Sequence, residues 1–174
     1  DRRQRQMCIR VSARVGRASG NTATDTLLMG TQIESANIVR YQGKTVTLSV
    51  NLQLRGGFTG TSFQVDVYSG TGIDETVSLG SGVFPTGNNQ LVSNDTAGID
   101  TALTGEYQTG LVTFTIPVDC TELLIRFSWN AVGTSGGSDD IRFDAVQLEE
   151  GSVATDFEYM PIGQKLALCQ RYYQ

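Results

Sequence analysis

The sequence of 174 residues contains no histidine. Histidine is the commonest general base and the commonest metal ligand, and its ring changes charge near neutral pH. Its absence excludes most hydrolase triads, the usual zinc sites and the ordinary pH switch. Carboxylates are the acid–base groups that remain, and their densest cluster lies between residues 139 and 158.

This carboxylate cluster lacks the pattern of a catalytic pair. A glycosidase needs two carboxyl groups that face each other across a cleft at a set separation. Asp140 and Asp144 instead occupy alternating positions beside Arg142, an arrangement typical of a solvated edge on one strand face. We therefore predict no catalytic residues and no enzyme activity.

Cysteines and long apolar runs are also scarce. The three cysteines form no Cys-x-x-Cys pair and are odd in number, which excludes a closed disulfide framework and a zinc finger. The longest apolar run has four residues, 166–169, whereas a membrane helix needs roughly 18. We expect no transmembrane span and no signal peptide. Because the sequence begins with Asp1 and not with Met, we expect a processed product or a fragment.

The sequence has few charged residues, and acidic residues outnumber basic ones. Charged residues make up 18% of the chain and the formal net charge is −5. Nucleic acid and anionic membranes would be repelled unless a basic patch stood apart. One run of arginines lies near the N-terminus: Arg2, Arg3, Arg5, Arg10, Arg14 and Arg17. The acidic total favours pairing of these arginines with Asp or Glu of a neighbouring strand or subunit, so we predict neither nucleic acid nor membrane as partner.

What the sequence has in abundance is apolar–polar alternation over short segments. Residues 44–54 place five apolar side chains on one face: Val46, Leu48, Val50, Leu52 and Leu54. This period of two predicts a strand with one buried face. The pattern recurs in residues 9–15, 63–68, 112–116 and 123–130. In 63–68 the polar face would hold Gln64, Asp66 and Tyr68.

The last alternating segment, residues 141–148, changes parity within itself. Ile141, Phe143 and Ala145 share one face, and Val146 and Leu148 follow on the opposite parity. A one-residue slip of this kind predicts a β-bulge near Ala145.

Glycine-rich and polar stretches separate these segments. They predict loops at 18–25, 55–60, 80–94 and 131–139. Residues 161–174 lack alternation and space Leu166, Cys169 and Tyr173 by three and four, which predicts a short helix. That helix either docks on the domain or meets other subunits, since a short helix gains most of its stability from packing. In either case Cys169 serves as a small hydrophobic residue.

Together these features predict an all-β chain. We expect a two-sheet antiparallel jelly-roll sandwich in residues 1–162 and a helical segment in residues 163–174, with an immunoglobulin-like strand arrangement as the alternative.

Two kinds of ligand site deserve testing on this scaffold. A sugar stacks its apolar face on an aromatic ring, and five rings fall in expected loops or on polar faces: Tyr41, Phe58, Tyr68, Phe84 and Tyr107. Each of these rings either packs beneath a loop or is open to a sugar, whereas the parity of Trp129 places it in the core. Asp139 and Asp140 lie in a loop that could offer oxygens to calcium, although they lack an ordered ligand spacing. We predict no other cofactor.

Two segments resemble a known family. Residues 145–174, AVQLEEGSVATDFEYMPIGQKLALCQRYYQ, resemble the C-terminal signature of a jelly-roll domain in virion proteins of tailed bacteriophages, in which a strand ending "VQLE-G" runs into "ATPFEYRP-G-ELALCQRYY". Residues 33–50, IESANIVRYQGKTVTLSV, are similar to the family's "IEG-N-ADL-GKTVTLSFW". The chain departs from the pattern at Asp156 and Met160, where the family often has Pro and Arg. Residues 55–110 do not align.

This resemblance implies a sandwich like that of carbohydrate-binding modules, displayed on a tail fibre, tailspike or head-decoration protein. It implies a homotrimer on the virion surface, and we expect other virion proteins and host cell-surface polysaccharide as partners. If the helix in residues 163–174 meets other subunits, Leu166, Cys169 and Tyr173 make the subunit contacts. It supplies no catalytic residues. Two alternatives stay open: a glycan-binding module of a larger carbohydrate-active enzyme, and a depolymerase that uses clustered carboxylates between subunits.

Overall fold

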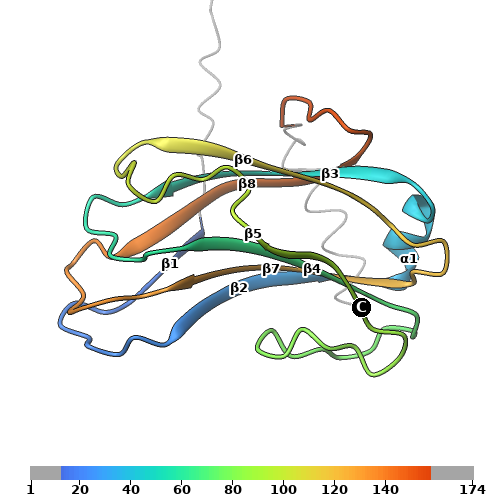
Figure 1. Ribbon diagram of the computed structural model, residues 1–174, viewed down its shortest axis with the longest axis horizontal. Coiled ribbons are helices and arrows are strands. Elements are labelled where there is room, and N and C mark those ends of the chain that lie inside the picture. Colours follow the sequence, from blue (N-terminus) through green and yellow to red (C-terminus); the bar gives the residue numbers. More distant parts are fainter. Residues whose placement is uncertain (1–12, 158–174) are drawn as a thin grey trace, which may run out of the picture.

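The computed structural model describes residues 13–157, which form a sandwich of two antiparallel four-stranded sheets (Figure 1). Sheet A has the strand order β1-β8-β3-β6, and sheet B has the order β2-β7-β4-β5. The strands are β1 (Ala13–Gly16), β2 (Thr26–Ile33), β3 (Thr45–Leu54), β4 (Phe63–Gly70), β5 (Asn89–Asp95), β6 (Tyr107–Thr115), β7 (Glu122–Asn130) and β8 (Asp140–Glu150).

This strand order decides between the two predicted arrangements. Every pair of consecutive strands except β4 and β5 is divided between the two sheets. This alternation is that of a jelly roll and differs from an immunoglobulin sandwich. The predicted all-β, two-sheet antiparallel fold is confirmed. The expected helical segment 163–174 and the first half of the expected strand 9–15 lie outside the described residues.

Alternation along β3 builds one wall of the core. All five apolar residues of the predicted buried face are buried, and Trp129 of β7 is buried as its parity predicted. Aromatic rings from both sheets meet between them: Phe63, Phe127 and Trp129 from sheet B with Phe143 from sheet A. The predicted bulge is also confirmed. Asn51 pairs with Ala145 while Leu52 pairs with Phe143, so that Asp144 is the extra residue.

The predicted polar face of β4 is wrong. Asp66 and Tyr68 are buried, and so are Leu124 and Ser128 at matching positions of β7. The reason is that residues 71–88 fold back beneath sheet B (green in Figure 1). Side chains of this loop pack with Tyr68 and Leu124 in a second apolar cluster: Val77, Leu79 and Phe84. Both faces of the two central strands of sheet B are therefore covered.

Two strands, one short helix and one 3-10 turn lie outside the predicted elements. β5 occupies residues 89–94 of the predicted loop 80–94 and ends at Asp95, so that part of the loop prediction is wrong. Most of its residues are exposed and it forms a sheet edge through pairing with β4, a tertiary contact that local sequence does not report. β2 lacks strict alternation and was missed, as were the helix α1 (Ser35–Ile38) and the 3-10 turn η1 (Val39–Tyr41) that follow it. Within residues 13–157, no helix has the length and apolarity to cross a bilayer.

Candidate functional site

Three of the five candidate aromatic rings are packed into the protein. Phe84 is 2% exposed and lies against Gly70. Tyr68 is 7% exposed, and its hydroxyl accepts hydrogen bonds from Arg126 and Gln90. Neither ring offers a face to a sugar, so these two predictions are wrong because loop 71–88 covers them. Phe58 is half-buried against the core.

The remaining two rings are accessible and lie in different places. Tyr107 opens β6 on the outer face of sheet A and is 46% exposed. Tyr41 ends η1 and is half-buried, with its inner side against the core. Of these two rings, Tyr41 lines a groove.

This groove, of about 550 Å³, lies between η1 and the end of β8, and we call it the Tyr41 groove. Tyr41 and Phe157 supply aromatic rings, and Val146 and Leu148 add aliphatic surface. The polar lining consists of Arg40, Gln147, Glu149, Glu150 and Thr155. Five of the nine lining residues are polar or charged, so the groove offers hydrogen-bonding groups beside a smaller aromatic and aliphatic surface. Its volume lies in the range of small-molecule sites, about 300–1,000 Å³.

The turn after η1 fixes the position of Tyr41. Gly43 has φ of +70°, a left-handed conformation that glycine adopts without steric cost. Its N–H donates to Ile116 O at 3.0 Å, and Gln42 Nε2 donates to Cys120 O at 2.7 Å. The guanidinium of Arg40 lies 4.7 Å from the centre of the Tyr41 ring, a cation–π contact that holds both side chains.

The opposite wall of the groove is ordered by Thr155. Its N–H and hydroxyl donate to the two carboxylate oxygens of Glu149 at 2.7 and 2.6 Å. The hydroxyl bond and the N–H bond of Thr155 hold the pKa of Glu149 below its ordinary value. Gln147 Nε2 also reaches the Thr155 hydroxyl, at 3.5 Å. Glu149 is thus an ionised acceptor in a fixed place.

The two carboxylates of the groove do not form the facing pair of a glycosidase. Glu149 is ionised and hydrogen-bonded, and Glu150 is paired with Lys44 at 2.7 Å. Adjacent residues of a strand point to opposite faces, so these two carboxylates do not face each other across a bond to be cleaved. The groove provides acceptors, a cation and aromatic surface.

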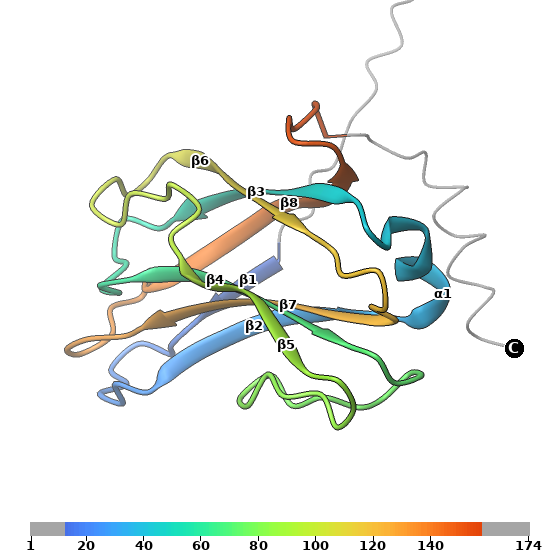
Figure 2. The ribbon, with the colours of Figure 1, turned by 45° about the vertical axis from the view of Figure 1, so that its right-hand side comes forward.

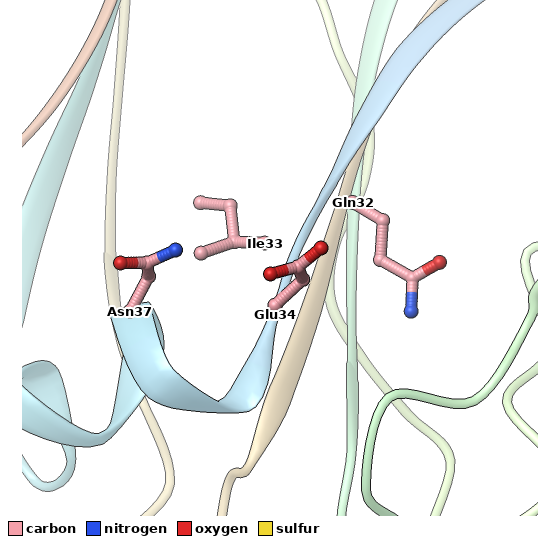
Figure 3. Close-up of a pocket in the computed structure, with 4 residues that line it drawn as sticks. All are labelled: Gln32, Ile33, Glu34 and Asn37. Carbon is pink, nitrogen blue, oxygen red and sulfur yellow. The ribbon is translucent and has the colours of Figure 1, made fainter. Parts of the chain in front are cut away.

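A second hollow, of about 370 Å³, lies at the end of β2 and is lined by Gln32, Ile33, Glu34 and Asn37. Figure 3 shows Ile33, Glu34 and Asn37 turned toward one another while Gln32 points the other way. The Gln32 amide donates to Glu75 O. None of the described residues that line this hollow is aromatic, so they offer no stacking surface to a sugar.

The two calcium candidates have other roles. Asp139 accepts hydrogen bonds from the Arg17 guanidinium and from the N–H and hydroxyl of Thr59. Asp140 is buried and lies 2.9 Å from the Arg14 guanidinium, so the prediction that it lies on a solvated edge is wrong. Across residues 13–157, no three acidic, cysteine or histidine side chains gather to hold a metal ion. The predicted pairing of arginines with neighbouring acidic residues is confirmed for Arg14 and Arg17.

One buried carboxylate escaped the sequence analysis. Glu122, at the start of β7, is 0% exposed. One of its oxygens accepts from the Glu75 N–H, and Oε2 has no partner among the described residues. Burial raises the pKa of Glu122, the Glu75 N–H opposes the rise, and the nearby charges of Glu75 and Asp74 add to it. Glu122 is therefore a buried carboxylate that is closed to solvent.

This carboxylate predicts a measurable pH effect. A carboxyl group with a raised pKa in the folded state stabilises the protein below its unfolded pKa, and that contribution disappears as pH rises through the folded pKa. We expect Glu122→Gln to match the native chain in thermal stability near pH 4 and to exceed it at pH 7. Thermal denaturation at both pH values checks this, with Glu150→Gln as an exposed control. A variant that loses stability equally at both pH values would contradict it.

Comparisons with known proteins give fold-level likenesses. No protein-family model matches the chain, and no curated protein matches it. Among solved structures, one described as CBM4 is 22% identical with a TM-score of 0.41, covering 80% of this chain and 71% of its own. A family 16 carbohydrate-binding module is 11% identical with a TM-score of 0.44, covering 80% and 76%. The CBM22-1 and GH10 modules of a Clostridium thermocellum endo-1,4-beta-D-xylanase are 15% identical with a TM-score of 0.42, covering 86% and 26%.

Proposed function

We propose that this chain is a non-catalytic saccharide-binding module and that the Tyr41 groove holds the sugar. The observation that carries the proposal is the pairing of aromatic surface from Tyr41 and Phe157 with a hydrogen-bonding wall of Gln147 and Glu149 in one groove. The volume of about 550 Å³ is that of a small-ligand site.

The chemistry of a pyranose matches the two sides of this groove. Its axial C–H face is apolar and stacks on an aromatic ring, and its rim of hydroxyls both donates and accepts hydrogen bonds. Ionised Glu149 accepts from hydroxyls, and charge-assisted bonds of this kind are about twice as strong as neutral ones. Arg40 donates from the other side. A shallow site of this kind binds one sugar weakly, and several copies on one polysaccharide raise the avidity.

The test is binding of the full chain to a panel of neutral polysaccharides, measured by affinity electrophoresis and calorimetry. We expect Tyr41→Ala to weaken binding by about tenfold, the equivalent of about 1.4 kcal/mol. Tyr107→Ala is the matched control, because it removes an exposed tyrosine outside the groove and leaves neutral-sugar binding unchanged. Gln147→Ala tests the opposite wall without removing a core contact. Binding to no neutral polysaccharide, or equal binding by Tyr41→Ala and Tyr107→Ala, would refute the proposal.

We further propose that the module is displayed on a tailed-bacteriophage virion as an oligomer. Its support is the resemblance of residues 145–174 and 33–50 to the virion family. Light scattering of the purified chain, repeated with Leu166→Asp and Tyr173→Asp, tests the assembly. A trimer that both substitutions dissociate supports it. A monomer that binds polysaccharide favours a module of a larger carbohydrate-active enzyme.

A further inference from the structure

We infer that the outer face of sheet A carries a second binding site, for saccharides that bear carboxylate groups. It is built on Arg14, Arg55 and Arg142 with Gln53 and Tyr107, and we call these five residues the arginine face. This site is separate from the Tyr41 groove and from the neutral-sugar binding proposed for it.

Strand register places four of these residues in one row. Tyr107 of β6 pairs with Gln53 of β3, Gln53 pairs with Arg142 of β8, and Arg142 pairs with Arg14 of β1. Paired residues in a sheet project from the same face. Since the neighbours of Gln53 along β3, Leu52 and Leu54, are in the core, the row lies on the outer face. In Figure 2, β3 and β6 of sheet A lie above β7 and β2 of sheet B.

Two cations lie directly opposite each other in this row. Like charges at paired positions destabilise a sheet, yet Arg14 and Arg142 occupy such a pair. Arg14 is drawn to Asp140, at 2.9 Å. Arg142 has no hydrogen bond or ion pair with another residue of the described range 13–157, so its guanidinium is available to an anion.

A third cation adjoins the row. Arg55 follows β3 two residues after Gln53 and so continues the outer face, and its N–H donates to Asp140 O at 3.0 Å. Arg55 Nε is buried and has no hydrogen-bond partner among the described residues. Both carboxylate oxygens of Asp140 are buried and accept no hydrogen bond within this part of the chain, and one of them forms the ion pair with Arg14. The three arginines together with Asp140, which pairs with Arg14, carry a formal charge of +2, on a chain of net charge −5. Asp144, the next acidic residue of β8, is left out of this charge because it already has an interaction.

The chemistry of the arginine face selects a carboxylated sugar. A guanidinium offers a planar pair of donors that matches a carboxylate. Tyr107, 46% exposed, supplies a ring at the far end of the row. Gln53 donates through Nε2 to Gly105 O at 2.7 Å, which leaves its carbonyl oxygen to accept from a hydroxyl. Nucleic acid fits less well, because the acidic remainder of the chain repels a long polyanion.

The experiment measures binding of the full chain to polygalacturonate, alginate and hyaluronate at low and moderate salt. Highly methyl-esterified polygalacturonate is the matched control, because it keeps the sugar and loses the charge. We expect binding to at least one free-acid polymer, a loss of tenfold or more with Arg142→Gln, a similar loss with Arg55→Gln, and weaker binding as salt rises. Tyr41→Ala keeps this binding, so failure of the groove proposal and failure of this one are distinguishable.

Three results would overturn the inference. The first is absence of binding to all three free-acid polymers. The second is equal binding to the esterified and free-acid forms, which would assign no role to the carboxylate. The third is tighter binding to a duplex DNA fragment than to any of the polysaccharides. A folded Arg142→Gln variant, checked by thermal denaturation, that binds as the native chain does would exclude Arg142 from the site.

Discussion

Replacing Arg17 by methionine is expected to lower the free energy of unfolding by about 3–5 kcal/mol, the usual cost of removing one partner of a buried ion pair. The Arg17 guanidinium donates to Asp139 at 2.7 and 3.0 Å. It also donates to the backbone oxygens of Ala23 at 2.7 Å and Gly133 at 2.9 Å, and to the Thr59 hydroxyl at 3.0 Å. One side chain therefore ties together three loops that are distant in sequence.

The loss is large because of what the substitution leaves behind. Asp139 would remain buried without its cation, and the loop carbonyls would lose their donor. An uncompensated buried charge costs more than the intact pair contributes. Since small domains are stable by only about 5–15 kcal/mol, the variant is expected to unfold at a much lower urea concentration than the native chain.

A second ion pair of the same length provides the control. Lys44 and Glu150 lie 2.7 Å apart, as do Arg17 and Asp139, but their side chains are 44% and 57% exposed against 3% and 4%. Exposed pairs contribute about 0.2–1 kcal/mol, so Lys44→Met should change little. Equal losses for Lys44→Met and Arg17→Met in urea titrations would show that burial does not set the strength of the Arg17 network.

The same network makes the stability of the fold depend on pH in the acid range. Burial on its own would raise the pKa of Asp139, but the Thr59 N–H, the Arg17 guanidinium and the Thr59 hydroxyl together hold this pKa below its ordinary value. A depressed carboxyl pKa gives stability that is present above the unfolded pKa, about 3.9, and is lost as pH falls through the folded value. Asp139→Asn has no carboxyl group to protonate, so its free energy of unfolding should fall less on acidification. We expect the difference in free energy of unfolding between Asp139→Asn and the native chain to shrink below about pH 4.

Replacing Phe143 by alanine is expected to cost about 3–5 kcal/mol, the usual range for a buried aromatic residue. Phe143 is the aromatic of sheet A in the inter-sheet cluster. Its ring centre lies 5.2 Å from that of Phe127, 6.3 Å from Trp129 and 6.4 Å from Phe63, all of sheet B. Its truncation leaves a cavity where the two sheets meet.

Two further variants separate cavity from surface effects. Phe143→Leu keeps most of the volume and should cost about 1–2 kcal/mol. Leu111→Ala, on the outer face of the same sheet and 49% exposed, should stay within about 0.5 kcal/mol. Chemical denaturation of the three variants checks the order. A loss for Phe143→Ala no larger than that for Leu111→Ala would mean that the sheets do not depend on this cluster.

Features set by local geometry could be predicted from the sequence alone. Side chains alternate along any strand, so the period of two located β3, β6, β7 and β8, the burial of Trp129, and the parity slip of the bulge at Asp144. The loop prediction failed at β5, and the polar-face prediction failed for Tyr68 and Asp66. Those failures share one cause, because alternation reports which side chains share a face but not whether another segment covers that face.

The candidate site depended on tertiary structure for the same reason. Tyr41 was among five equivalent aromatic residues in the sequence, and only the fold placed it beside Thr155 and Phe157 while covering Phe84 with its own loop. The arginine face likewise exists because register sets Arg142 between Arg14 and Gln53 on neighbouring strands. Sequence fixes the local period through the backbone, whereas strand pairing and loop paths bring distant residues together, and these are decided by the packing of the whole chain.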